Sequence, residues 1–335
     1  MKTPAPVPVS KKPRISGAYR LLELAVRAMG FKRIFDLDEQ ELKAYIKKNL
    51  NKQKTAPPGF IYRKYRVREW MVDQRPCYII SPQEGVRPQV PLKRDTAELK
   101  PPVPKTLLFL HGGGMIMEAH LIHWIVISKM ISCLGVTVWV PVYPLAPHGF
   151  REITEKLFPV YEKMLEENPG SEVTVLGDSA GGTLALILCH HNKARGMPLP
   201  MPHKLILVSP GVFARKDNRT IRDEMDRILP RDPVLSPRLM DILISWMVAA
   251  PDRGSYFEMP TEADFSGFPG TYVFFGTREI FYAAASPFIE RLRSAGVPVK
   301  VYLGEGMMHI WPYMPVSRES REALKIIFAI IEGKG

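Results

Sequence analysis

The chain has 335 residues and a formal net charge of +12, with 46% hydrophobic and 24% charged residues. This composition is typical of a soluble globular enzyme and excludes disorder for most of the chain. The lysines and arginines are scattered among acids, without a basic helix, a ladder of stacking aromatics or a zinc-ligand spacing. The charge therefore predicts a solvated basic surface and no nucleic-acid partner.

The cysteines and the N-terminus both point to a cytoplasmic protein. Cys77, Cys133 and Cys189 lie far apart without a CxxC spacing, so we expect small buried thiols in a reducing compartment, with no metal, cofactor or disulfide framework. The opening residues lack the apolar core of a secretory signal, and no later stretch approaches the roughly twenty apolar residues of a membrane span.

The first hundred residues predict an arm, two helices and a hairpin. Proline-rich residues 1–15 indicate a flexible arm. Apolar residues at helical spacing predict helices over 18–29 and 38–50, and we interpret residues 16–55 as an N-terminal cap segment. Strands over 62–72 and 77–81 are expected to pair across a turn at 73–76.

From residue 104 onward, short apolar runs alternate with helix-length segments, which indicates an α/β fold with a mostly parallel sheet covered by helices on both faces. We expect one catalytic domain over 56–335, with a cap insertion over 211–255 that carries a helix near 239–249, and a C-terminal helix over 318–332. The predicted strands of the sheet are 106–110, 136–142, 172–176, 204–209, 271–275 and 299–303.

A GxSxG pattern, Gly177-Asp178-Ser179-Ala180-Gly181, follows one predicted strand and precedes a helical stretch. A serine on such a strand-to-helix turn is pushed out of the sheet, and the glycines leave room for the backbone. The motif therefore predicts Ser179 as a nucleophile. The alternative is a glycine-rich turn with an ordinary helix-capping serine.

A second glycine turn, His111-Gly112-Gly113-Gly114, follows the strand over 106–110. Its flexible amides can point at a developing negative charge. We predict that the amides of Gly112, Gly113 and Ala180 form an oxyanion hole for a carbonyl held over Ser179.

A serine hydroxyl needs a base to take its proton, and imidazole titrates near working pH. Of the eight histidines, only His309 follows the last strand in a loop that could reach back over the sheet, so we predict His309 as the base. Glu279, just after the strand over 271–275, is the predicted acid that orients it. Asp252 and Asp264 remain the alternatives for the acid.

At this point the chain resembles the hormone-sensitive-lipase-like branch of the α/β-hydrolase carboxylesterases. It shares HGGGM, YPLAP at 143–147, GDSAGG, GTREI and the MMHIWP loop, over residues from about 104 to 330. The resemblance implies the same triad and oxyanion donors. Two positions depart from the family pattern: the acid is Glu279 where Asp is commoner, and a DYRLAPE-like segment reads VYPLAPH.

Methionines and a tryptophan beside the two loops predict flexible apolar contacts to the substrate, from Met115, Met117, Met308 and Trp311. We therefore expect a serine carboxylesterase that hydrolyses hydrophobic, short-chain acyl or acetyl esters through an acyl-serine. Two alternatives stay open: a peripheral lipase whose N-terminal helices touch membrane, and a non-catalytic small-molecule receptor on the same fold. No oligomeric state is predicted.

Overall fold

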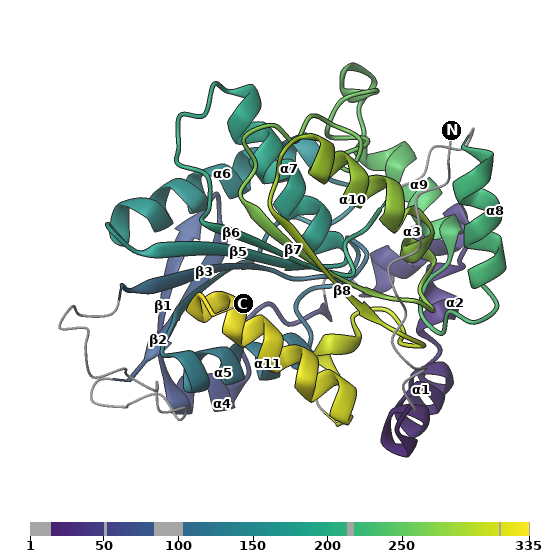
Figure 1. Cartoon of the computed structure of the whole chain (residues 1–335), viewed down its shortest axis with the longest axis horizontal. Helices are drawn as coiled ribbons and strands as arrows, with labels where there is room; N and C mark the ends of the chain where they lie inside the picture. Colours follow the sequence, from purple (N-terminus) through teal and green to yellow (C-terminus); the bar gives the residue numbers. More distant parts are fainter. Residues whose placement is uncertain (1–14, 50–51, 84–102, 213–217, 315, 335) are drawn as a thin grey trace.

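The structure is a computed structural model and describes residues 15–49, 52–83, 103–212, 218–314 and 316–334 (Figure 1). The predicted arm over 1–15 lies, except for Ile15, outside these residues.

An eight-stranded sheet forms the centre, in the order β1-β2-β4-β3-β5-β6-β7-β8. β1 and β2 form an antiparallel hairpin and β2 pairs antiparallel with β4, while every other neighbouring pair is parallel. This confirms the predicted mostly parallel sheet. The strands are Tyr65–Val72 (β1), Arg75–Pro82 (β2), Lys105–Leu110 (β3), Thr137–Pro141 (β4), Glu172–Asp178 (β5), Lys204–Val208 (β6), Gly270–Gly276 (β7) and Val299–Gly304 (β8).

Helices cover both faces of this sheet (Figure 1). On one face lie α6 (Phe150–Glu167), α7 (Ala180–Ala194) and α10 (Ala285–Ser294), and on the other lie α4 (Gly59–Lys64), α5 (Leu121–Leu134) and α11 (Arg318–Glu332). Each face buries its own apolar cluster, because alternate side chains of a strand point to opposite sides: Leu108 and Leu110 join one cluster, Leu107 and Phe109 the other.

The N-terminal helices α1 (Gly17–Met29), α2 (Phe31–Phe35) and α3 (Glu39–Asn49) gather at one end of the sheet with α8 (Arg219–Ile228) and α9 (Pro237–Met247) (Figure 1). α1 ends at Gly30, whose φ of 73° is the left-handed value that a glycine cap supplies. The Ser236 hydroxyl donates to Asp36 Oδ1 at 2.7 Å, which ties α9 to α2. The division into cap and catalytic domain stays a prediction. Short 3₁₀ helices cover Ala250–Asp252 (η2), Ile280–Ala284 (η3) and Trp311–Tyr313 (η4).

The first hairpin differs from the prediction where each of its two strands begins. Residues 62–64 belong to α4, so β1 begins at Tyr65. The turn needs only Asp73 and Gln74, both with positive φ (47° and 64°), and residues 75–76 already pair in β2. Two residues with positive φ suffice because their twist matches that of paired strands. Helix α8 was not predicted, since only Met225 and Ile228 of it are buried and most of its other residues are charged.

Candidate active site

Ser179 sits on the sharp turn between β5 and α7 with φ 51° and ψ −122°, a conformation that L-residues rarely adopt. Its amide donates to the Val208 carbonyl at 2.9 Å and its carbonyl accepts from the Gly211 amide at 3.0 Å, so β6 and the loop after it hold the turn. A Cβ on Gly181 would lie 2.0 Å from the Leu110 carbonyl oxygen. Only glycine therefore lets α7 start this close to the end of β3.

Three predicted side chains meet above this turn. His309 Nε2 lies 2.8 Å from Ser179 Oγ, and His309 Nδ1 lies 2.5 Å from Glu279 Oε2. A carboxylate can only accept, so Nδ1 carries the proton and Nε2 is left as an acceptor for the serine proton. Glu279 is 0% exposed, and its other oxygen accepts from the Gly276 amide at 2.8 Å.

The two alternative acids are engaged elsewhere. Asp252 pairs with the Arg151 guanidinium, and Asp264 pairs with Lys193 at 2.5 Å and accepts from the Ser266 amide. The structure therefore brings Glu279, and neither aspartate, to the base.

Asp232, which the sequence did not single out, supports the loop that carries Glu279, called the acid loop below. Its Oδ2 accepts from the Ile280 amide at 2.9 Å, and its Oδ1 accepts from the amides of Val234 and Leu235 at 2.8 and 2.9 Å. Burial raises the pKa of this carboxyl. These bonds join the loop before α9 to the residue that follows Glu279.

The predicted oxyanion turn lies against the nucleophile. A Cβ on Gly112 would come within 3.0 Å of Ser179 Cβ and 2.3 Å of Asp178 Oδ2, so nothing larger than glycine fits there. Ala180 is the first residue of α7, where an amide has no acceptor within the helix. The Gly113 carbonyl accepts from the amides of Ile116 and Met117 at 3.2 and 3.1 Å, which closes the turn.

The segment over 143–147 braces this turn. The Tyr143 ring stacks on His111 with centroids 4.5 Å apart, and its hydroxyl donates to the His111 carbonyl. The Ala146 amide donates to the Met115 carbonyl at 2.7 Å. Burial lowers the pKa of His111 to about 3, so the ring is neutral and its Nδ1–H can donate to the Gly112 carbonyl, 2.7 Å away.

A second buried pair, Asp178 and His123, lies beneath the same turn. His123 Nδ1 accepts from the His120 amide at 2.9 Å, so the proton sits on Nε2 and is donated to Asp178 Oδ2 at 3.2 Å. Because Asp178 Oδ2 also occupies the space that a Cβ on Gly112 would need, the pair fixes the floor of the turn. No sequence pattern indicated this role for His123.

The predicted substrate-contacting residues fall on opposite faces of the sheet. Met115 and Met117 join the apolar cluster under α6 and α7, whereas Met308 and Trp311 join the cluster under α5 and α11. Met117 also lines an open hollow of about 420 Å³ with Tyr45 and His120. Substrate contact by these four residues stays a prediction.

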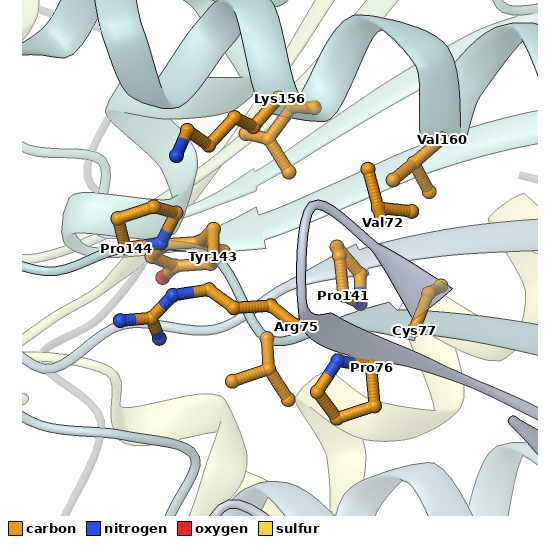
Figure 2. Close-up of a pocket in the computed structure, with 11 residues that line it drawn as sticks. Val72, Arg75, Pro76, Cys77, Pro141, Tyr143, Pro144, Lys156 and Val160 are labelled. Atoms are coloured by element: carbon orange, nitrogen blue, oxygen red, sulfur yellow. The ribbon is translucent and has the colours of Figure 1, made fainter. Parts of the chain in front are cut away.

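Ser179 and His309 have little access to solvent. Ser179 is 6% exposed and His309 3%. A Cβ on Gly114 would lie 3.1 Å from both Phe35 of α2 and Leu239 of α9, so these helices pack directly onto the oxyanion turn. The cavity shown in Figure 2, beside Tyr143, has a volume of about 10 Å³ and neither Ser179 nor His309 lines it. It has room for about one water and is no substrate site.

Known proteins resemble this chain in sequence and in fold. A family model described as the alpha/beta hydrolase fold matches residues 107–313. An acetyl-hydrolase of Streptomyces hygroscopicus is 26% identical over 68% of this chain and 75% of its own length. An esterase of Acinetobacter venetianus is 28% identical over 60% of this chain and 65% of its own length. A crystal structure of an esterase from the bacterial hormone-sensitive lipase family superposes with a TM-score of 0.70 at 20% identity, over 95% of this chain and 98% of that one.

Proposed function

Because the chain belongs to the α/β-hydrolase fold family, we propose that it is a serine carboxylesterase that cleaves hydrophobic, short-chain acyl or acetyl esters. One observation carries the proposal: the buried hydrogen-bonded series from Ser179 Oγ through His309 to Glu279, at 2.8 and 2.5 Å. This arrangement activates a serine for attack on a carbonyl carbon.

In the proposed reaction Ser179 Oγ attacks the ester carbonyl while His309 Nε2 takes its proton. The amides of Gly112, Gly113 and Ala180 bind the oxyanion. His309 returns the proton to the departing alkoxide oxygen, which releases the alcohol and leaves an acyl-serine. Water then attacks the acyl-serine, His309 accepts the water's proton, and the proton passes to Ser179 as the carboxylic acid leaves.

The closed site supports a short acyl group. Phe35 and Leu239 pack against Gly114 of the oxyanion turn, and we infer that the acyl chain of a bound ester extends toward them. The names of the two relatives, an acetyl-hydrolase and an esterase, agree with this substrate class. A non-catalytic receptor would need no base on its serine, so the contact between His309 and Ser179 favours an enzyme.

A panel of p-nitrophenyl esters tests the substrate proposal. We expect kcat/KM to be highest for acetate to butyrate and to fall at least tenfold for the decanoate, because a longer chain must displace Phe35 or Leu239. The control is the Phe35→Ala variant, which should recover activity on the decanoate. Equal turnover across the panel, or no turnover of any ester, would contradict the proposal.

A second candidate, a peripheral lipase, is favoured by the outer face of α1. Leu21 and Leu24 are 70% and 62% exposed on the face opposite buried Tyr19 and Val26. Arg20 and Arg27 are exposed on the same helix, so an anionic lipid surface fits it.

Vesicle sedimentation tests this candidate. The protein should pellet with phosphatidylserine vesicles at low salt and be released at high salt, and the Leu21→Ser, Leu24→Ser double variant should pellet at least fivefold less. Phosphatidylcholine vesicles serve as the control. If wild type and variant sediment alike, α1 is no membrane anchor.

A cytoplasmic location remains part of the proposal. Cys77, Cys133 and Cys189 are all free thiols, which supports a reducing compartment. Among the helices that the structure describes, none has the length and apolar character to cross a bilayer.

A further inference from the structure

The loop that carries His309 is held by hydroxyl groups on both sides. The Ile310 amide, just after His309, donates to Ser209 Oγ at 3.0 Å. The Met308 amide, just before it, donates to the Tyr19 hydroxyl at 2.5 Å. Ser209 directly follows β6 in the catalytic sheet, but Tyr19 belongs to α1, almost three hundred residues away in the sequence. The N-terminal segment therefore supplies one of the two bonds to the amides that flank His309.

The burial of Tyr19 holds its hydroxyl in position for this contact. It is 0% exposed within the cluster that also contains Met308. Burial raises its pKa well above the ordinary value for tyrosine, so the hydroxyl stays neutral and can accept the amide proton. A phenol held in an apolar cluster has few other partners, so this hydrogen bond fixes the Met308 amide in place.

One turn further along α1, Glu23 reaches the acid loop. Its Oε2 accepts from Arg278 Nη1 at 2.7 Å, and its Oε1 accepts from Arg27 at 3.0 Å. Arg278 directly precedes Glu279, and its amide donates to the Met307 carbonyl at 3.0 Å, which links the acid loop to the base loop. Residues at i and i+4 share one face of a helix. The inner face of α1 thus touches the chain next to both the base and the acid.

We propose that Tyr19 is a positioning residue for His309, and that α1 clamps the base and acid loops through Tyr19 and Glu23. This inference rests on the proposed esterase function. The 2.8 Å contact between His309 and Ser179 depends on the path of the loop over 304–310. Bonds to the chain around Thr277 hold the first part of this loop, and Ser209 and Tyr19 hold the two amides that flank His309. Losing the bond to Tyr19 lets the imidazole move away from the serine, and small displacements of a reacting group are costly.

Tyr19→Phe tests the proposal, with Tyr161→Phe as a matched control. Tyr161 is also buried and its hydroxyl also makes one bond to the backbone, to the Pro200 carbonyl at 2.7 Å, but it lies on α6 away from the loops of the base and acid. With p-nitrophenyl butyrate, Tyr19→Phe should lower kcat about tenfold or more with KM changed less than twofold. Tyr161→Phe should shift the urea midpoint by a similar amount and leave kcat unchanged.

Hydrogen exchange separates this proposal from the esterase function. The peptide over 304–313 should exchange its amides faster in Tyr19→Phe than in wild type or Tyr161→Phe, whether or not any ester is turned over. If Tyr19→Phe does not fold, Glu23→Gln replaces it, and it should lower kcat in the same direction by weakening the bond to Arg278. An unchanged kcat, a change in KM alone, or unchanged exchange in this peptide would overturn the proposal. A wild-type protein with no turnover would refute the esterase function and leave the exchange result to decide the role of Tyr19.

Discussion

Ser179→Ala is expected to lower kcat for p-nitrophenyl butyrate about 10⁶-fold, to the level of the oxyanion turn and binding alone. The change removes one oxygen atom. Alanine has the same Cβ as serine and therefore tolerates φ 51° no worse, and the backbone bonds of residue 179 to Val208 and Gly211 persist. The variant should unfold at the same urea concentration as wild type, so the lost rate reports the nucleophile and not the fold.

The measurement pairs steady-state kinetics with labelling by a fluorophosphonate, which forms an adduct only with an activated serine. Wild type should gain one adduct and Ser179→Ala none. Ser286 is exposed near the start of α10. The Ser286→Ala variant controls for the loss of a serine and should match wild type in both assays. Retention of more than about 1% of the wild-type kcat, where a loss of about 10⁶-fold is expected, would show that another residue performs the attack.

The parts of the site that could be predicted are those encoded in short stretches of sequence. Ser179 and Gly112 stand directly after strands, and parallel strands deliver their carboxyl ends to one edge of a sheet. Once the strands were recognised from their apolar runs, the order of nucleophile, acid and base along the chain left His309 as the base. The structure brings these residues within hydrogen-bond distance, while their catalytic roles remain a proposal.

The supporting residues could not be predicted, because each acts through a contact between distant positions. In the sequence, Tyr19 is one of several apolar residues of a predicted helix. Asp232 is one of the acids in the predicted insertion, and His123 lies beyond the glycine turn. Their roles come from bonds to Met308, Ile280 and Asp178 respectively. No local pattern specifies such partners, since packing of separate elements decides them.

The methionines show a further limit of the sequence, which does not say toward which face of the sheet a loop side chain packs. Met117 and Met308 both stand beside catalytic loops in the sequence, yet they pack on opposite faces of the sheet. A loop at the edge of a sheet can send its side chains to either face, and composition does not say which.

The second large effect is expected from Glu279→Gln, which should lower kcat about 10⁴-fold. The Glu279 carboxylate accepts two hydrogen bonds, from the Gly276 amide at 2.8 Å and from His309 Nδ1 at 2.5 Å. Glutamine has one acceptor oxygen, and its NH₂ group only donates. If that oxygen keeps Gly276, the NH₂ group faces Nδ1, which must then lose its proton to Nε2. Nε2–H cannot accept the proton of Ser179, so the base is disabled with its position unchanged.

Glu279→Asp and Glu305→Gln complete this experiment. Aspartate keeps both acceptor oxygens but is one methylene shorter, so we expect a loss of about tenfold to a hundredfold in kcat, between wild type and Glu279→Gln. Glu305 is exposed on the loop before His309, and its change to glutamine removes a nearby charge without touching the imidazole. It should leave kcat within twofold of wild type.

If Glu279→Gln retained more than a tenth of the wild-type kcat, or if Glu305→Gln lowered kcat as much as Glu279→Gln does, Glu279 would act only as a local charge. A tautomer effect requires the order Glu305→Gln, Glu279→Asp, Glu279→Gln from most to least active, because only the last variant removes an acceptor that Nδ1–H needs.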